Sequence, residues 1–260
     1  MHLELTSKSV LITGASQGIG RATARAFAAE GCHLHLSARN EEALKALQSE
    51  VIEKYAIRCS VYPMDLSNDA AMQALADAVG DVDVLFNNAG DIPHGPLEAV
   101  GDVAWRKGFD LKVFGYISLC RIYMARMESK RSGVIVNNIG NSAELFDSLY
   151  IAGVSGNASL VAFTKALGGT SLNAGVRVVG VNPGPVATAR TVRSMKRRSI
   201  DLYGTEDRWE ELYDRYPGKR AATPEEVADL VVFLGSPKAG YITGTIVTID
   251  GGIASRGSII

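Results

Sequence analysis

The sequence predicts a single-domain Rossmann-type α/β fold, a doubly wound parallel sheet of about seven strands with helices on both faces. Short apolar runs alternate with longer amphipathic stretches along all 260 residues, and this alternation is typical of parallel sheets with helical crossovers. A glycine-rich turn follows the first apolar run, as in nucleotide-binding folds. Neither a Pro- or Ser-rich linker nor a repeat divides the chain, so we expect one domain over residues 1–260.

The individual elements follow from periodicity and from end signals. Apolar runs predict strands over residues 10–12, 34–36, 60–62, 82–86, 133–137, 176–181 and 246–249. Amphipathic stretches predict helices over residues 21–30, 41–55, 70–79, 105–128, 156–173 and 224–235. Gly31 ends the first helix, and Thr223 followed by Pro224 begins the last, because these residue types favour helix ends of those kinds.

The segment 188–216 departs from this alternation. It is polar and mixed in charge, and it contains Tyr203, Trp209, Tyr213 and Tyr216. It follows a strand end, which is where ligands bind in α/β folds. We interpret it as a substrate lid within the single domain, and the alternative is a surface excursion without a ligand role.

Composition argues against several kinds of partner. The formal net charge is −1 with acidic and basic residues interspersed, which argues against nucleic acid and anionic membranes. Cys32, Cys59 and Cys120 stand in no metal-ligand spacing, so we expect buried thiols and no metal site. The N-terminus lacks a signal-peptide pattern and no apolar run is long enough to span a membrane, so we expect a cytoplasmic protein.

The turn at residues 13–20, Thr-Gly-Ala-Ser-Gln-Gly-Ile-Gly, predicts a dinucleotide site. Glycines let the backbone approach a pyrophosphate, and the free N–H groups and dipole of the following helix favour its charge. The expected cofactor contacts in this turn are Gly14, Ser16, Gln17, Gly18, Ile19 and Gly20.

This glycine spacing and four further motifs resemble the short-chain dehydrogenase/reductase family over essentially the whole chain. The motifs are Asp65-Leu66, Asn87-Asn88-Ala89-Gly90, Asn182-Pro183-Gly184 and Ile249-Asp250-Gly251-Gly252. The resemblance implies cofactor contacts at Asp65, Leu66, Asn88, Ala89, Gly90, Asn157, Pro183, Gly184, Val186 and Thr188. It also implies a homo-oligomer, a tetramer or a dimer, that packs through the two long helices.

The end of the second strand indicates which dinucleotide is bound. A carboxylate there would bind both ribose hydroxyls and repel a 2′-phosphate. The sequence Ser37-Ala38-Arg39-Asn40 has none, and Arg39 can pair with a phosphate and stack on adenine. NADP(H) is therefore favoured, with Arg39 and Asn40 as contacts. NAD(H) stays an alternative, as does a solvated Arg39.

The family's chemistry uses a serine, a tyrosine and a lysine four residues after the tyrosine, with an upstream asparagine. The stretch 163–167 resembles the family's sequence on the same helix, and counting back from it places the tyrosine position at Gly153 and the lysine position at Asn157. General acid–base catalysis contributes about 10²–10⁴-fold, and glycine has no proton to donate. The usual chemistry is therefore not supported at these two positions.

The positions of the family's serine and asparagine also hold other residues in this sequence. The serine position falls on Gly140 or Asn141, with Ser142 next, and the asparagine position falls on Asp110. Tyr150 lies about one helical turn before the vacant tyrosine position. Our candidate catalytic residues are Tyr150 as proton donor and Asn141 or Ser142 as hydrogen-bond donors to a substrate oxygen. Loop packing is the alternative for each.

Three functions fit these observations. The first is an atypical NAD(P)-dependent oxidoreductase that acts on an unknown carbonyl or alcohol, and we favour it because the cofactor motifs are complete. The second is a catalytically silent NADP(H)-binding protein. The third is a lyase or isomerase that uses the same pocket. Gly140, Gly153 and Gly156 indicate either a roomier pocket beside the nicotinamide or close helix packing.

Overall fold

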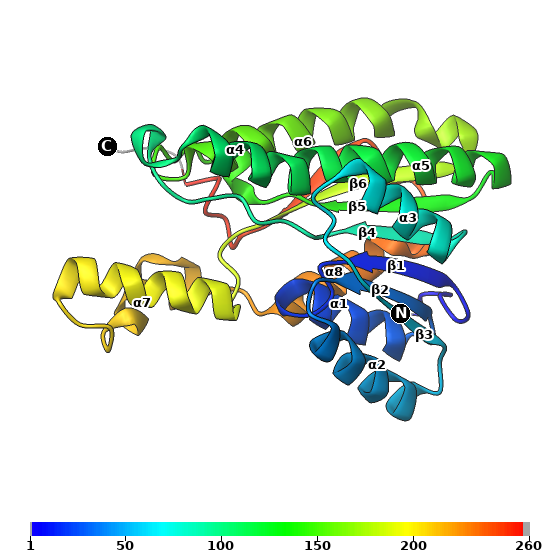
Figure 1. Cartoon of the computed structure of the whole chain (residues 1–260), viewed down its shortest axis with the longest axis horizontal. Coiled ribbons are helices and arrows are strands. Elements are labelled where there is room, and N and C mark those ends of the chain that lie inside the picture. The colour runs from blue at the N-terminus through cyan, green and yellow to red at the C-terminus, as the bar shows by residue number, and fades with distance from the viewer. Residues whose placement is uncertain (1, 257–260) are drawn as a thin grey trace.

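The computed structural model describes residues 2–256 of the chain (Figure 1). One sheet of seven parallel strands runs through it in the order β3-β2-β1-β4-β5-β6-β7. The strands are β1 Ser9–Thr13, β2 His33–Ala38, β3 Cys59–Pro63, β4 Val84–Asn87, β5 Gly133–Asn138, β6 Val176–Pro183 and β7 Thr245–Ile249. The predicted fold class, a doubly wound parallel sheet in one domain, is confirmed.

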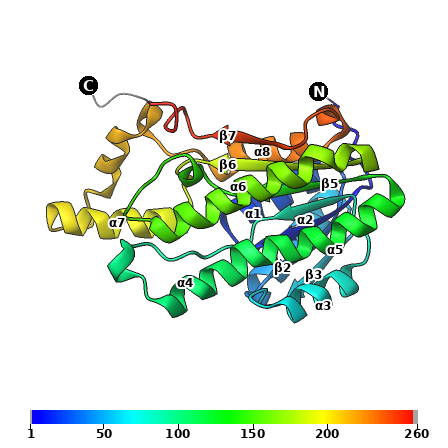
Figure 2. The same cartoon turned by 90° about the horizontal axis from the view of Figure 1, so that it is seen from above.

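Helices cover both faces of this sheet (Figures 1 and 2). On one face lie α1 Gly18–Ala29, α2 Glu41–Tyr55 and α8 Pro224–Gly235, and on the other lie α3 Asp69–Val79, α5 Gly115–Lys130 and α6 Ile151–Ser171. Two further helices, α4 Asp102–Phe109 and α7 Ala189–Tyr203, extend past the carboxyl ends of the strands. Whether α5 and α6 pack against a second copy stays a prediction.

Strand periodicity explains the two cores. Successive side chains of a strand point to opposite faces, so a strand that is covered on both sides favours apolar residues at every position. In β1, Val10 and Ile12 pack in the core beneath α1, α2 and α8, and Leu11 packs in the core beneath α3 and α5. All three side chains are fully buried.

Two helices begin at residues whose side chains cap them, and the sequence predicted one of these caps, Thr223. Asn40 accepts a hydrogen bond from the Ala43 N–H at 2.9 Å and begins α2. Thr223 and Glu226 form a reciprocal capping box at the start of α8, the arrangement that satisfies two backbone donors at once. The predicted ranges 41–55 and 224–235 coincide with these helices.

The long helix predicted over 105–128 is interrupted. It consists of α4, a π-helical turn over Asp110–Phe114 and α5. π-Turns are rare and concentrate at functional sites, and this one lies beside the carboxyl ends of β4 and β5. Periodicity did not reveal it, because one widened turn leaves the apolar pattern on either side nearly unchanged.

The segment 188–216 contains a helix that we did not predict. Thr188 accepts a hydrogen bond from the Thr191 N–H at 3.3 Å and begins α7, and a 3₁₀ turn over Trp209–Arg215 follows. Figure 1 shows α7 projecting away from the sheet. Its role as a lid stays a prediction. None of the helices within residues 2–256 is both long enough and apolar enough to cross a membrane.

Candidate functional site

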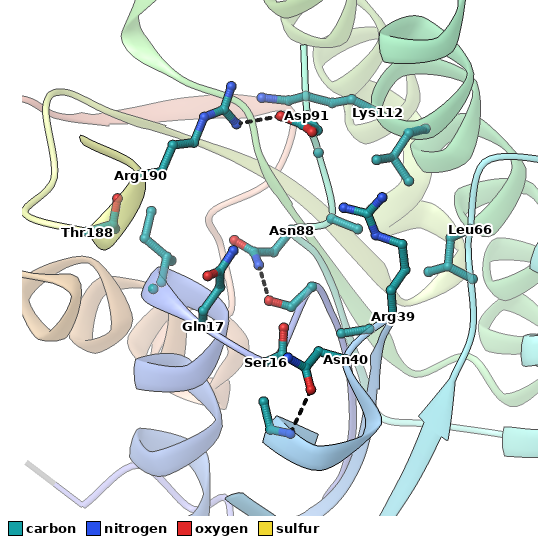
Figure 3. Close-up of a pocket in the computed structure, with 18 of the residues that line it drawn as sticks. Ser16, Gln17, Arg39, Asn40, Leu66, Asn88, Asp91, Lys112, Thr188 and Arg190 are labelled. Atoms are coloured by element: carbon teal, nitrogen blue, oxygen red, sulfur yellow. Dashed lines mark hydrogen bonds and ion pairs between the residues drawn. The ribbon is translucent and has the colours of Figure 1, made fainter. Parts of the chain in front are cut away.

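A cavity of about 770 Å³ opens at the carboxyl ends of β1 and β4, where the strand order reverses (Figure 3). Doubly wound folds bind their ligands at this switch point. The predicted cofactor contacts that line it are Gly14, Ser16, Gln17, Gly18, Ile19, Arg39, Asn40, Asp65, Leu66, Asn88, Ala89, Gly90 and Thr188. Five others, namely Gly20, Asn157, Pro183, Gly184 and Val186, are not among its lining residues.

The glycine-rich turn requires its glycines for two different reasons. Gly14 and Gly18 have φ angles of +66° and +54°, in the left-handed region where a side chain is strained. An ideal Cβ on Gly20 would lie 2.3 Å from the carbonyl oxygen of Gly14, so a side chain there would prevent the turn from closing. The lack of a side chain at Gly20 therefore lets the turn close, while Gly14 and Gly18 line the cavity.

Asn88 joins the ends of three strands around the cavity. Its Nδ2 donates to the carbonyl oxygens of Thr13 at 3.0 Å and Gly14 at 3.2 Å, and its Oδ1 accepts from Asn138 Nδ2 at 2.8 Å. The Thr13 hydroxyl accepts from the N–H groups of Asn88 and Ala89, at 2.9 and 3.0 Å. The amide thus fixes the glycine-rich turn on β1 against the residues that follow β4 and β5.

The charged residues that line the cavity carry excess positive charge. They are Arg39, Lys112, Arg190 and Arg193 against Asp65 and Asp91. Arg190 and Asp91 form an ion pair of 3.4 Å (Figure 3). A glycine cradle at a helix N-terminus with surplus cations is suited to an anionic dinucleotide. The residues present therefore fit the cofactor that the sequence predicts.

Several residues that line the cavity were not predicted from the sequence. Asp91, Leu111, Lys112, Asn138, Arg190 and Arg193 belong to the cavity but to none of the motifs quoted above. Lys112 lay within the predicted long helix, where nothing distinguished it from a solvent-exposed lysine. Arg190 and Arg193 belong to the segment interpreted as a lid, so the segment was predicted to lie near a ligand although its residues were not.

Tyr150 occupies the space above Gly153. An ideal Cβ on Gly153 would lie 2.0 Å from Tyr150 Cζ, the ring carbon that carries the hydroxyl. The ring stacks on His94 with centroids 4.0 Å apart and planes 18° apart. Burial raises the pKa of the Tyr150 phenol, an effect that Arg190 opposes. Tyr150 lies beside the cavity and is not one of its lining residues.

The other candidate catalytic residues fall into two groups. Asn157 is buried, and its Nδ2 donates to the Ser142 hydroxyl at 2.7 Å, so the structure brings these two together. Asn141 is turned elsewhere, because its amide donates to Asp250 Oδ2 at 3.3 Å. Asp110 is exposed at the first residue of the π-turn.

The glycines near these residues allow close packing. The space at Gly153 is filled by the Tyr150 ring, and an ideal Cβ on Gly156 would lie 2.9 Å from Ile92 Cδ1. Gly140 has a φ of +133°, and an ideal Cβ there would lie 2.9 Å from Asn157 Nδ2. Of the two interpretations left open by the sequence, the structure therefore favours close packing over a roomier pocket.

Known proteins resemble this chain along nearly its whole length. A family described as Enoyl-(Acyl carrier protein) reductase matches residues 14–254. The 2-keto-3-deoxy-L-fuconate dehydrogenase of Xanthomonas campestris pv. campestris is 33% identical over 96% of this chain and 81% of its own. The galactitol 2-dehydrogenase (L-tagatose-forming) of Cereibacter sphaeroides is 34% identical over 93% of this chain and 92% of its own.

A solved structure agrees with the fold in the same way. The L-sorbose reductase of Gluconobacter frateurii, crystallised with NADPH and L-sorbose, superposes with a TM-score of 0.92 at 29% identity. The superposition covers 99% of this chain and all of that one. The fold therefore belongs to an architecture already seen in a protein crystallised with NADPH.

Proposed function

Because this chain belongs to the short-chain dehydrogenase/reductase family, we propose that it is an NADP(H)-dependent oxidoreductase acting on a carbonyl or alcohol group of a small polyhydroxylated substrate. The bound dinucleotide would supply or accept the hydride at its nicotinamide ring. The substrate class is supported by the relatives, which are named for a sugar acid, a polyol and a ketose.

Arg39 supports NADP(H) over NAD(H). It follows β2 and lines the cavity at the position where a carboxylate would instead select NAD(H). A guanidinium can form paired hydrogen bonds with a phosphate and stack on a base at the same time. The Asn40 side-chain oxygen already accepts from the Ala43 N–H, so the amide nitrogen of this side chain is the group that would donate to the cofactor.

The observation that carries the proposed chemistry is the placement of the Tyr150 hydroxyl end above Gly153. A phenol from one turn upstream therefore stands over Gly153, the residue that we infer to hold the position of the family's tyrosine. Burial keeps the phenol protonated at neutral pH, and because it raises the pKa it also makes the phenol a weaker acid, so the proton would pass to a substrate oxygen that gains negative charge as the hydride arrives. Tyr150 would therefore be the proton donor to the oxygen of a carbonyl during reduction.

Replacing Tyr150 by phenylalanine tests this role. The ring and its stacking on His94 are retained while the hydroxyl is lost, so turnover should fall by at least about tenfold with little change in folding. The assay follows NADPH absorbance with a panel of ketoses and aldehydes. Tyr241→Phe is the control, because Tyr241 is 92% exposed. Unchanged turnover in Tyr150→Phe would remove Tyr150 from the mechanism.

A silent dinucleotide-binding protein is the second candidate. Asn157 and Gly153 at the lysine and tyrosine positions favour it, as does the placement of Tyr150 outside the cavity lining. It predicts NADP(H) binding by calorimetry without turnover across the carbonyl panel, and one good substrate would exclude it. Product formation without a change in nicotinamide absorbance would instead identify a lyase or isomerase.

A further inference from the structure

Lys112 extends from the π-turn into the dinucleotide cavity. Its stem passes over the backbone of Gly90, where an ideal Cβ would lie 2.9 Å from Lys112 Cδ. Its ammonium donates to the carbonyl oxygen of Ile139 at 2.6 Å. Figure 3 shows the side chain reaching along the cavity toward Arg190 and Asp91. The ammonium therefore lies between the ends of β4 and β5.

This location adjoins the vacant lysine position. The Ile139 carbonyl oxygen accepts the hydrogen bond from Lys112, and Gly140 follows Ile139 in the chain. Gly140 lies close to the Asn157 amide, because an ideal Cβ on Gly140 would lie 2.9 Å from Asn157 Nδ2. The Lys112 ammonium and the Asn157 amide thus contact adjacent residues of one strand-end segment. Lys112 reaches this segment from the π-turn between α4 and α5, and Asn157 reaches it from α6.

The ammonium has unused hydrogen-bonding capacity. It carries three donors, and within residues 2–256 the hydrogen bond to Ile139 is the one found for it. The side chain is half-buried and lines the cavity. Burying a cation with so few partners is costly unless another group completes its shell. Hydroxyl oxygens of a bound ribose would do so.

The surroundings of Lys112 also bear on its charge. Burial lowers its pKa to about 7, and the nearby Arg190 acts in the same direction. Arg190 on α7 is itself paired with Asp91 after β4, while Arg39 and Asp65 line the cavity from the ends of β2 and β3. Tyr150, which precedes α6, and Asn157 on α6 are not among the residues that line the cavity. A dinucleotide's negative charge would favour the ammonium and raise its pKa on binding.

We propose that Lys112 replaces the cation missing from position 157, binding the nicotinamide-ribose hydroxyls and placing a positive charge at the reacting end of the cofactor. This inference rests on the proposed dinucleotide-binding function. It assigns the site's cation to a residue of the π-turn, in place of one on α6. It also assigns a purpose to the π-turn, which turns Lys112 across Gly90 toward β5.

Dinucleotide binding with Lys112→Met tests the contact itself. NADPH fluorescence should show a dissociation constant raised by at least about tenfold, the usual effect of losing a charge-assisted hydrogen bond. Adenosine 2′,5′-bisphosphate lacks the nicotinamide half, so its affinity should change by less than about twofold. The control is Lys107→Met, an exposed lysine on α4, which should leave both affinities unchanged.

Proton uptake distinguishes this role from a structural one. Calorimetry at about pH 8 in two buffers of different ionisation enthalpy should show the wild type taking up between about half a proton and one proton on binding NADPH. His94, whose pKa is lowered mainly by burial, is already neutral there. Lys112→Met should take up none. Lys112→Arg keeps the charge but does not titrate, so it should bind NADPH within about threefold of wild type without uptake.

The outcomes separate this inference from the proposed function. Wild-type protein that binds no NADPH would overturn both. Wild-type binding with an unchanged dissociation constant in Lys112→Met, or with unchanged proton uptake in Lys112→Met or Lys112→Arg, would overturn the role of Lys112 alone. If circular dichroism shows that Lys112→Met does not fold, Lys112→Arg tests the role of Lys112 by itself. Retained proton uptake on NADPH binding in Lys112→Arg would refute that role, and loss of the uptake would support it.

Discussion

Replacing Gly153 by alanine tests the placement of Tyr150, on which the proposed chemistry depends. The added methyl group would lie 2.0 Å from Tyr150 Cζ and 2.1 Å from Cε1, well inside the contact distance of two carbon atoms. The ring must therefore move, and in moving it gives up its stacking on His94. Backbone geometry is not at issue, because Gly153 lies in the first turn of α6 without a positive φ.

Opposing contributions determine the size of the effect. Overpacking costs about 1–3 kcal/mol and the lost aromatic pair about 0.5–1.5 kcal/mol. Replacing a helical glycine by alanine gains about 0.5–1 kcal/mol. In the wild-type background we expect the free energy of unfolding to fall by roughly 1–3 kcal/mol. In a Tyr150→Ala background the clash is absent, so Gly153→Ala should stabilise by about 0.5–1 kcal/mol.

Urea denaturation of the wild type, both single variants and the double variant measures this coupling. The expected result is a change of sign between the two backgrounds. Gly169→Ala is a matched control in the same helix, because an ideal Cβ there meets no atom within 4 Å, and it should stabilise equally in both. An equal effect of Gly153→Ala in both backgrounds would refute the placement of the Tyr150 ring over Gly153. It would also remove the observation that supports Tyr150 as the proton donor.

Three further substitutions test other parts of the molecule. Arg39→Gln should weaken NADPH binding by roughly 10–100-fold and NADH binding by less than about threefold; calorimetry that shows equal losses would separate Arg39 from the 2′-phosphate. The Arg220 guanidinium and the Thr223 N–H lower the pKa of Glu226 to about 2, so its stabilising contribution is present above its unfolded pKa of 4.5 and is lost as the pH falls toward 2. Glu226→Gln should therefore flatten the dependence of Tm on pH in that window, and an unaltered slope would contradict this. The buried Arg177 donates to backbone carbonyls at the end of α8, at 2.8 and 2.9 Å. Arg177→Met should lower the free energy of unfolding by about 2–5 kcal/mol in urea, because those carbonyls lose their partner; a loss below about 1 kcal/mol would indicate that water replaces the guanidinium.

Much of the fold could be predicted because its signals are local. Each strand was marked by a short run with apolar residues, which is fully buried in β1 at Val10 to Ile12 because that strand is covered on both faces. The helix 41–55 was located to the residue by its amphipathic pattern, and the helix 224–235 also by its cap Thr223. A cap of this kind acts within four residues of the chain and is visible without the fold.

Other elements depend on contacts from elsewhere in the chain. The helix α6 begins at Ile151, five residues before the predicted start, through a stretch whose glycines disfavour a helix. There Gly156 packs against Ile92 and Gly153 against the Tyr150 ring, so tertiary packing outweighs the local preference. The π-turn at Asp110–Phe114 likewise lies where α4 and α5 pass the strand ends.

The sequence by itself determined the doubly wound sheet, the dinucleotide turn and most of the residues that line its cavity. These depend on short-range patterns, namely apolar periodicity, glycine spacing and motifs directly after strands. Only the tertiary structure decided that Lys112 reaches the Ile139 carbonyl, that Tyr150 covers Gly153 and that Asn141 turns to Asp250. The physical reason is that a parallel sheet gathers the carboxyl ends of its strands at one edge, so side chains distant in the chain converge there and their directions depend on packing around them.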